Sequence, residues 1–152
     1  MASSWTFASG IRTMPKWGSL YYSKHELVFV FKVGTAPHFT TINAPRHRRN
    51  RTNMWHYAPA KSPSSGRGEN VSLRPAVKPT TLVADAIQDV TGAGDLVLDT
   101  FLGSGTTLIA CDRCGRRFRG LEIDPAHLDF VIERWTAMTG ATPKLLQRSG
   151  SR

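Results

Sequence analysis

Residues 95–107 read DLVLDTFLGSGTT, a short apolar segment that leads into a turn with two glycines. Leu96 to Leu98 predict a short buried strand, and the turn from Phe101 to Gly105 follows it. A helix is predicted from Thr106 to Cys114. Open α/β sheets bind their ligands at the carboxyl ends of the strands. The turn is therefore the first candidate for a binding site.

The same alternation continues on both sides of this unit. A second strand is predicted from Phe118 to Ile123, and a second helix from Pro125 to Met138, with Asp124 as its N-cap and proline at its first position. Upstream, apolar residues at helical spacing follow Pro79 and predict a helix that ends near Gly92. Strands that alternate with helices indicate an α/β fold with a doubly wound parallel sheet and a right-handed crossover.

The first part of the chain has a weaker pattern. Residues 1–25 are irregular, and no element is predicted there. Glu26 to Lys32 reads as a buried strand that needs cover on both faces, because its apolar run is continuous and rich in β-branched and aromatic residues. Residues 33–70 have no period, and Lys61 to Asn70 have a linker composition. A stretch this long is expected to be functional rather than a simple connector.

Positive charge is concentrated in this first part. Residues 1–79 hold 12 Lys and Arg against 2 Asp and Glu, a balance of +10, whereas residues 80–152 hold 8 against 9, a balance of −1. A basic segment beside a near-neutral domain is typical of proteins that bind a polyanion, because neutralised phosphates release counterions. The alternative is a solvated basic face.

The two cysteines and the hydropathy argue against a metal-binding, a redox-active and a membrane-spanning protein. Cys111 and Cys114 form a single C-x-x-C without further ligands at zinc spacing, so no metal site is predicted. A redox pair is disfavoured because the motif lies inside the predicted helix and not at its N-terminus. The longest apolar run, Leu27 to Phe31, is far too short to cross a bilayer. We therefore expect a soluble, cytoplasmic protein of one domain.

Three kinds of nucleotide site compete for the turn. A phosphate-binding P-loop requires a lysine after the last glycine, where the chain has Thr106. A dinucleotide fingerprint requires a third glycine at the position of Leu108. In the third, Glu122 at the end of the second strand accepts hydrogen bonds from both ribose hydroxyls of an adenosine, and Asp99 meets an ammonium group. The spacing of 19 positions between Gly103 and Glu122 favours this third interpretation.

Three motifs together resemble those of the β-class DNA amino-methyltransferases, which methylate adenine N6 or cytosine N4. Residues 99–107 (DTFLGSGTT) resemble the DPFxGSGTT cofactor motif of that family, and residues 120–125 (GLEIDP) resemble its acidic motif. Residues 74–79 (RPAVKP) are similar to its HPTxKP segment. The resemblance is strong over 74–135 and extends back to about residue 16.

This resemblance implies a Rossmann-like methyltransferase fold, incomplete and with a basic insertion, in which residues 71–138 form a cofactor-binding βαβα core. The implied cofactor is S-adenosylmethionine. The residues expected to bind it are Lys78, Asp99, Phe101, Gly103, Ser104, Gly105, Thr106 and Glu122.

The chain also departs from the family pattern. Thr100 replaces a proline, Arg74 a histidine and Ala76 a threonine. The family carries a D/N/S-P-P-Y/F/W tetrapeptide that holds the target base, yet these 152 residues contain no Pro-Pro pair. No catalytic residue is therefore predicted. We expect a truncated copy, or one half of a split enzyme whose catalytic motif lies on a separate polypeptide.

The basic part of residues 33–70 corresponds in order to the target-recognition region of that family. It combines arginines with amide and aromatic side chains, which can contact phosphates or bases of double-stranded DNA. The residues expected to bind DNA are Arg46, Arg48, Arg49, Arg51, Asn53 and Trp55. The alternative is a basic loop that touches phosphates only.

Three hypotheses about function remain. The first is a DNA methyltransferase that uses S-adenosylmethionine. The second is a catalytically inactive remnant that binds DNA and cofactor. The third is a basic RNA-binding protein in which the glycine turn is incidental.

Overall fold

The computed structural model describes residues 5–16, 20, 23–37, 39–40, 52–57 and 77–146. These residues form three helices and five strands, and the strands form two sheets. In chain order the elements are β1 (Trp5–Lys16), β2 (Ser23–Phe31), β3 (Met54–Tyr57), α1 (Thr80–Val90), β4 (Leu96–Asp99), α2 (Thr106–Cys114), β5 (Arg117–Gly120) and α3 (Pro125–Thr139).

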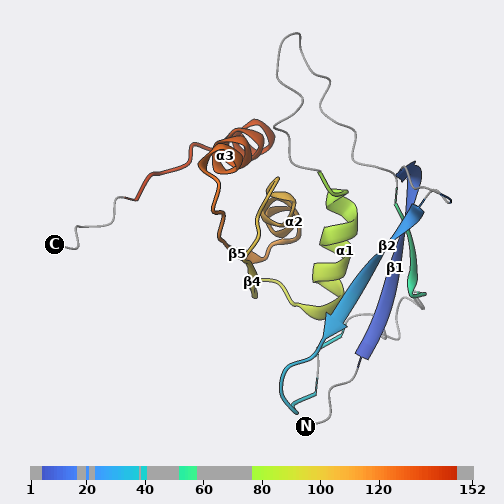
Figure 1. The fold of residues 1–152 in the computed structure, drawn as a ribbon. Coiled ribbons are helices and arrows are strands. Elements are labelled where there is room, and N and C mark those ends of the chain that lie inside the picture. The colour runs from blue at the N-terminus through green and yellow to red at the C-terminus, as the bar shows by residue number, and fades with distance from the viewer. Residues whose placement is uncertain are drawn as a thin grey trace.

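β4 and β5 form the predicted βαβ unit, in which two parallel strands are joined through α2. Leu96 pairs with Arg117, and Asp99 pairs with Gly120 at the carboxyl end. α1 packs against α2, and α2 lies between α1 and α3 (Figure 1). The small core between helices and strands consists of Ile87, Ala110 and Cys111, with Val97 and Phe118 packed against them.

The other sheet has the order β2-β1-β3 and lies beside α1 (Figure 1). β1 is antiparallel to β2 and parallel to β3. β3 is joined to α1 by the Tyr57 hydroxyl, which donates a hydrogen bond to the Asp85 carboxylate at 2.5 Å. Neither β1 nor β3 was predicted, because β1 mixes apolar residues with Gly, Ser and Arg, and β3 is only four residues long.

The strand predicted over 26–32 exists as β2, but the prediction that it is buried is wrong. Leu27, Phe29 and Phe31 are each more than half exposed, at 57%, 53% and 64%. β2 is an edge strand of the described sheet. A continuous apolar run indicates a strand, but it does not establish what lies over it.

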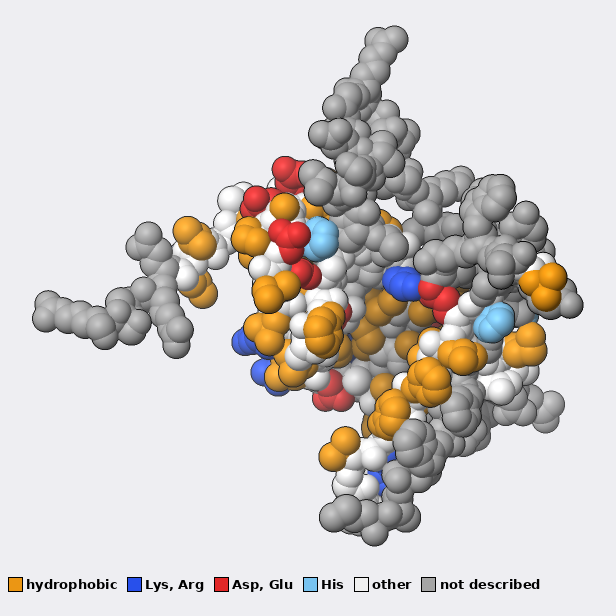
Figure 2. Space-filling model, in the orientation of Figure 1, with side chains coloured by type: hydrophobic (Ala, Val, Ile, Leu, Met, Phe, Trp, Pro, Cys, Tyr) orange, Lys and Arg blue, Asp and Glu red, His pale blue; other side chains and the backbone are white. Residues whose placement is uncertain are grey.

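The prediction of a buried strand at Leu96 to Leu98 is also wrong in part. Val97 faces the core, whereas Leu96 and Leu98 point the other way and are 54% and 63% exposed. The described helices cover only one face of the β4–β5 pair. Figure 2 shows hydrophobic side chains gathered over these two strands. β5 also ends at Gly120 and not at Ile123 as predicted.

The helix predictions are confirmed. α2 has the predicted bounds, and α1 and α3 agree with the predicted bounds within two residues. The carboxylate of Asp124 accepts a hydrogen bond from the Ala126 N–H at 2.9 Å and so caps α3. Caps and apolar spacing are local features, which explains why the sequence indicates these elements reliably.

Candidate functional site

The glycine turn connects the end of β4 to the start of α2. Gly103 and Gly105 have φ angles of +53° and +73°, in the left-handed region that favours glycine. A Cβ added to Gly105 would lie 2.7 Å from Val131 Cγ1 of α3, whereas a Cβ on Gly103 would meet only the Phe101 carbonyl, at 3.8 Å. Gly105 is therefore enclosed by α3, while the backbone at Gly103 is open to a ligand.

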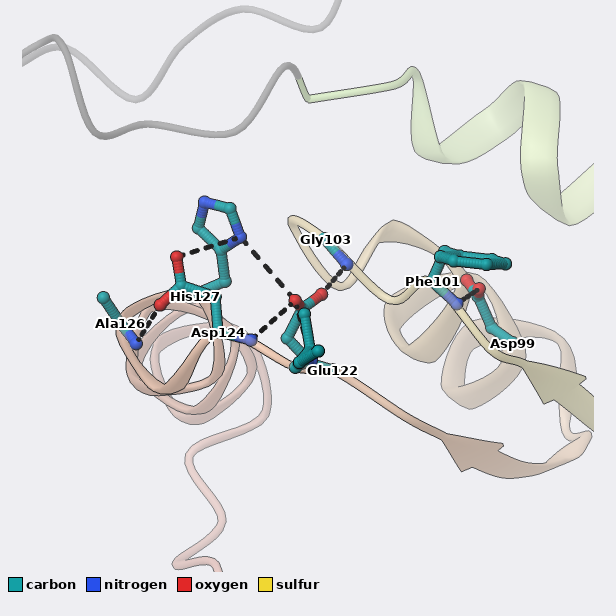
Figure 3. A network of polar contacts seen from close by, with 8 residues as sticks. Asp99, Phe101, Gly103, Glu122, Asp124, Ala126 and His127 are labelled. Carbon is teal, nitrogen blue, oxygen red and sulfur yellow. Dashed lines mark hydrogen bonds and ion pairs between the residues drawn. The ribbon is translucent and has the colours of Figure 1, made fainter.

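The carboxylate of Glu122 lies directly against this turn (Figure 3). Its Oε2 accepts a hydrogen bond from the Gly103 N–H at 2.6 Å, and its Oε1 accepts from the N–H groups of Ile123 and Asp124 at 3.0 and 3.1 Å. The side chain is only 8% exposed. The structure thus brings together two loops that follow adjacent parallel strands.

The backbone N–H groups of Asp124 and Gly103 hold the pKa of Glu122 below its ordinary value, with a smaller contribution from His127. The carboxylate is therefore ionised at neutral pH. An ionised carboxylate has about four acceptor sites, and three backbone bonds leave it able to accept from a hydroxyl group.

His127, in the first turn of α3, stands beside this carboxylate (Figure 3). Its Nδ1 lies 3.8 Å from Glu122 Oε1 and 3.9 Å from Asp124 Oδ2, and its side chain is about one third exposed. Sequence reasoning missed His127. The only available signal was its position three residues after the N-cap of a helix that begins at the site.

Asp99 and Phe101 lie at the opening of the turn. The Asp99 carboxylate accepts a hydrogen bond from the Phe101 N–H at 3.0 Å, which fixes the first bend after β4. The Phe101 side chain is 90% exposed. An aromatic ring this exposed beside a polar turn presents a free face for stacking.

Ser104 and Thr106 point inward, away from solvent. The two residues are only 6% and 5% exposed, and their hydroxyl oxygens lie 3.2 Å apart. Arg134 of α3 donates from Nη1 to the Ser104 carbonyl at 2.7 Å and to Thr106 Oγ1 at 3.2 Å. Sequence reasoning missed Arg134, because the burial of Val131, three residues before it, is known only from the structure.

Lys78 contacts the three-stranded sheet through an ion pair. Its ammonium forms an ion pair with Glu26 of β2 at 2.5 Å, and both side chains are partly exposed, at 49% and 37%. This pair joins the start of α1 to the three-stranded sheet. Of the eight predicted site residues, the structure gathers Asp99, Phe101, Gly103, Ser104, Gly105, Thr106 and Glu122 around one loop.

Comparison with known proteins agrees with this geometry. The model of the DNA methylase family N6_N4_Mtase matches residues 13–133, well over half of the chain. The chain belongs to this family of DNA methylases.

Two curated type II methyltransferases are among the relatives of this family member. M.Cfr9I of Citrobacter freundii is 37% identical over 71 residues, which are 43% of this chain and 24% of the relative. M1.MboII of Moraxella bovis is 32% identical over 85 residues, which are 53% of this chain and 33% of the relative. The matched part of the chain thus spans a third or less of these relatives.

Solved structures of DNA methylases show the same fold. A protein of Thermus thermophilus described as a putative DNA modification methylase, in complex with S-adenosyl-L-methionine, is 26% identical with a TM-score of 0.59. The match covers 86% of this chain and 52% of that structure. PvuII DNA methyltransferase (cytosine-N4-specific) is 19% identical with a TM-score of 0.64, and the match covers 85% and 50%. This DNA methylase chain therefore has their Rossmann-like α/β fold over about half their length.

Only two of the six residues expected to bind DNA lie among the described residues. Asn53 is exposed just before β3, and Trp55 within β3 is partly buried, with its indole N–H donating to the Thr52 carbonyl at 3.1 Å. Arg46, Arg48, Arg49 and Arg51 lie outside the described residues.

The cysteine pair of α2 belongs to the core. Cys111 is fully buried, and Cys114 Sγ donates to the Ala110 carbonyl at 2.9 Å within α2. Burial raises the pKa of the Cys111 thiol to about 11, so no reactive thiolate forms there at neutral pH. Among the described residues no cluster has the composition of a metal site, and no helix is long and apolar enough to cross a membrane.

Proposed function

We propose that this chain forms the S-adenosylmethionine-binding half of a DNA methyltransferase that acts on the exocyclic amine of adenine or cytosine. The observation that carries the proposal is the 2.6 Å hydrogen bond between the Gly103 N–H and the Glu122 carboxylate. It supports the proposal because it places a carboxylate of lowered pKa beside the glycine turn. An adenosine bound at this turn would have its ribose hydroxyls near Glu122 and would lie close to the open backbone of Gly103.

Each residue around the turn has a role in this proposal. Glu122 accepts a hydrogen bond from a ribose hydroxyl at its remaining acceptor site, and Phe101 offers its exposed ring to the adenine. Asp99 interacts with the ammonium end of the cofactor, directly or through water. Gly103 permits close approach of the backbone to the cofactor, Gly105 leaves room for Val131 of α3, and Ser104 and Thr106 support the turn from inside. When bound, S-adenosylmethionine supplies an electrophilic methyl group.

Lys78 has a separate place in the proposal. Its ammonium pairs with Glu26 and would contact the cofactor only after leaving that partner. Exposed ion pairs contribute only about 0–1 kcal/mol, so a ligand carboxylate can compete for the lysine. If a Lys78→Met variant binds the cofactor as tightly as the wild type, Lys78 does not contribute to cofactor binding.

DNA is the proposed substrate. The +10 balance of residues 1–79 favours a polyanion, and the family to which the chain belongs methylates DNA. We assign DNA contact to the basic segment within residues 33–70 and cofactor binding to residues 71–138. The names of the type II relatives favour a role in restriction–modification, with DNA and cofactor both met in the cytoplasm.

The catalytic tetrapeptide of the family must come from outside these 152 residues, which contain no Pro-Pro pair. Among the described strands β4 has a neighbour on one edge only, and Leu96 and Leu98 are exposed on one face. Parallel sheets are stable when both faces are covered. We therefore propose that a segment with the tetrapeptide completes the sheet at β4, on the same protein or on a separate polypeptide.

Calorimetric titration with S-adenosylmethionine tests the proposed cofactor site. We expect Glu122→Gln to weaken binding about ten- to hundredfold, because hydrogen bonds to a charged acceptor are lost. Glu133→Gln, at an exposed position of α3, is the matched control and should bind like the wild type. Absence of binding by the wild type would contradict the proposal and favour an RNA-binding protein.

A second candidate function is a non-catalytic protein that binds DNA and cofactor. The missing Pro-Pro pair favours it for this chain alone. Transfer of labelled methyl groups to DNA separates the two. Methylation by the chain alone would exclude the inactive protein, and methylation only after addition of a polypeptide with the tetrapeptide would indicate a split enzyme.

A further inference from the structure

Arg134 of α3 reaches across to the glycine turn and donates hydrogen bonds to it. Nη1 donates to the Ser104 carbonyl at 2.7 Å and to Thr106 Oγ1 at 3.2 Å. Thr106 Oγ1 in turn lies 3.2 Å from the Ser104 hydroxyl. One guanidinium group therefore connects the residues on both sides of Gly105.

The same helix also packs against the turn. Val131, one helical turn before Arg134, is 3% exposed and occupies the space beside Gly105 where a side chain would otherwise stand. α3 thus contacts the turn twice, through an apolar group and through a cation. Both contacts involve residues 104–106 of the turn, whereas Glu122 accepts its hydrogen bond from Gly103.

Burial makes these hydrogen bonds costly to lose. The Ser104 and Thr106 side chains are almost completely buried, and buried polar groups need partners. No described carboxylate forms an ion pair with Arg134, so its hydrogen bonds serve the turn and not an acidic partner.

We propose that Arg134 is a positioning residue of the cofactor site, which holds the Gly103–Thr106 turn in the shape that receives S-adenosylmethionine. The inference rests on the proposed function. Arg134 acts through Ser104 and Thr106 and does not touch the cofactor. Its planar group suits two acceptors held at fixed positions, whereas the ammonium of a lysine would restore the charge without this geometry.

The test compares cofactor affinity in four variants of the full 152-residue chain by calorimetry. We expect Arg134→Met to weaken S-adenosylmethionine binding about ten- to hundredfold, and Arg134→Lys to fall between Met and the wild type, because the lost bonds involve a charged donor. Arg113→Met removes an exposed arginine and should stay within about twofold. Cys111→Ala weakens the core away from the turn, so it should lower the melting temperature with little effect on affinity.

Equal affinity of Arg134→Met and the wild type would overturn the inference. So would a loss of affinity in Cys111→Ala as large as that in Arg134→Met, because the effect would then be one of stability. If the wild type itself does not bind, the proposed function fails, and amide hydrogen exchange still tests Arg134. Faster exchange at Gly103 to Thr106 in Arg134→Met than in Arg113→Met would support the positioning role, and equal exchange would contradict it.

Discussion

At the scale of single residues, the site depends on groups that make several contacts at once. The Glu122 carboxylate accepts three backbone hydrogen bonds from two loops, and Arg134 supports one of those loops from behind. The left-handed glycines give the turn a shape that other residues adopt only at a cost. The site is therefore largely formed by backbone groups whose positions a few side chains fix.

The lowered pKa of Glu122 makes the stability of the site dependent on pH. Because the folded value lies below the ordinary value of 4.5, the ionised carboxylate stabilises the folded chain above about pH 4.5, and this contribution is lost as the pH falls through the folded pKa. We expect the difference in unfolding free energy between wild type and Glu122→Gln to shrink from pH 6 to pH 3. Denaturant titrations at several pH values measure it. A constant difference would show that no stabilisation depends on this ionisation.

Gly105 and Gly115 form a matched pair for a test of the turn. Both have a left-handed φ, +73° and +69°, but only Gly105 has atoms where a Cβ would stand. We expect Gly115→Ala to cost about 1–2 kcal/mol for conformation alone. Gly105→Ala should cost about 1–3 kcal/mol more, because the methyl group overlaps Val131. Equal losses in chemical denaturation would mean that α3 does not press against the turn.

At the scale of elements, local signals predicted the helices and longer-range signals were missing for the strands. Pro79, Asp124 and the apolar spacing mark α1 and α3, since caps and periodicity act within a few residues. β3 pairs with β1, far away in the chain, as in the pair Ser9 and Met54. β1 pairs with the next strand, β2, but its own residues have no pattern that marks a strand. The burial predicted for β2 and β4 was wrong because it depends on elements that would lie over them.

The residues of the candidate site also differ in how well the sequence predicts them. Gly103 and Glu122 could be predicted because strand ends in a parallel sheet lie side by side, so two motifs were enough to suggest their proximity. His127 and Arg134 could not, since a helix sequence does not reveal which of its polar residues turns toward a distant loop.

Asp124 gives a test of one of these elements. Its carboxylate caps α3 through the Ala126 N–H at 2.9 Å, so Asp124→Ala should destabilise the chain by about 1 kcal/mol. Asp129→Ala, at an exposed position on the same helix, also removes one negative charge and is expected to change stability by less than about 0.5 kcal/mol. Thermal and denaturant unfolding measure both. Equal effects would indicate that the loss of charge, and not of the cap, is responsible.

At the scale of the whole molecule, charge and chemistry are separated along the chain. The excess of positive charge lies in residues 1–79, whereas the glycine turn and Glu122 lie in residues 80–152, which are close to neutral. The Lys78–Glu26 ion pair and the Tyr57–Asp85 hydrogen bond join the three-stranded sheet to α1, which packs on α2 behind the glycine turn. This arrangement connects the proposed DNA-binding region to the candidate cofactor site and keeps the excess of positive charge out of the latter.

The separation predicts a specific salt dependence of DNA binding. Each phosphate contact contributes about 0.9 to the slope of log K against log salt concentration for duplex DNA. If all four arginines at positions 46, 48, 49 and 51 contact phosphates, their replacement by glutamine should reduce the slope by about 3 to 4 and weaken binding at every sequence tested. Replacement of Arg113, Arg117 and Arg119, in the near-neutral half, should leave the slope within about 1 of the wild type. Fluorescence anisotropy with labelled duplexes measures the slopes, and a larger loss in the second variant would move the DNA-binding surface to the cofactor half.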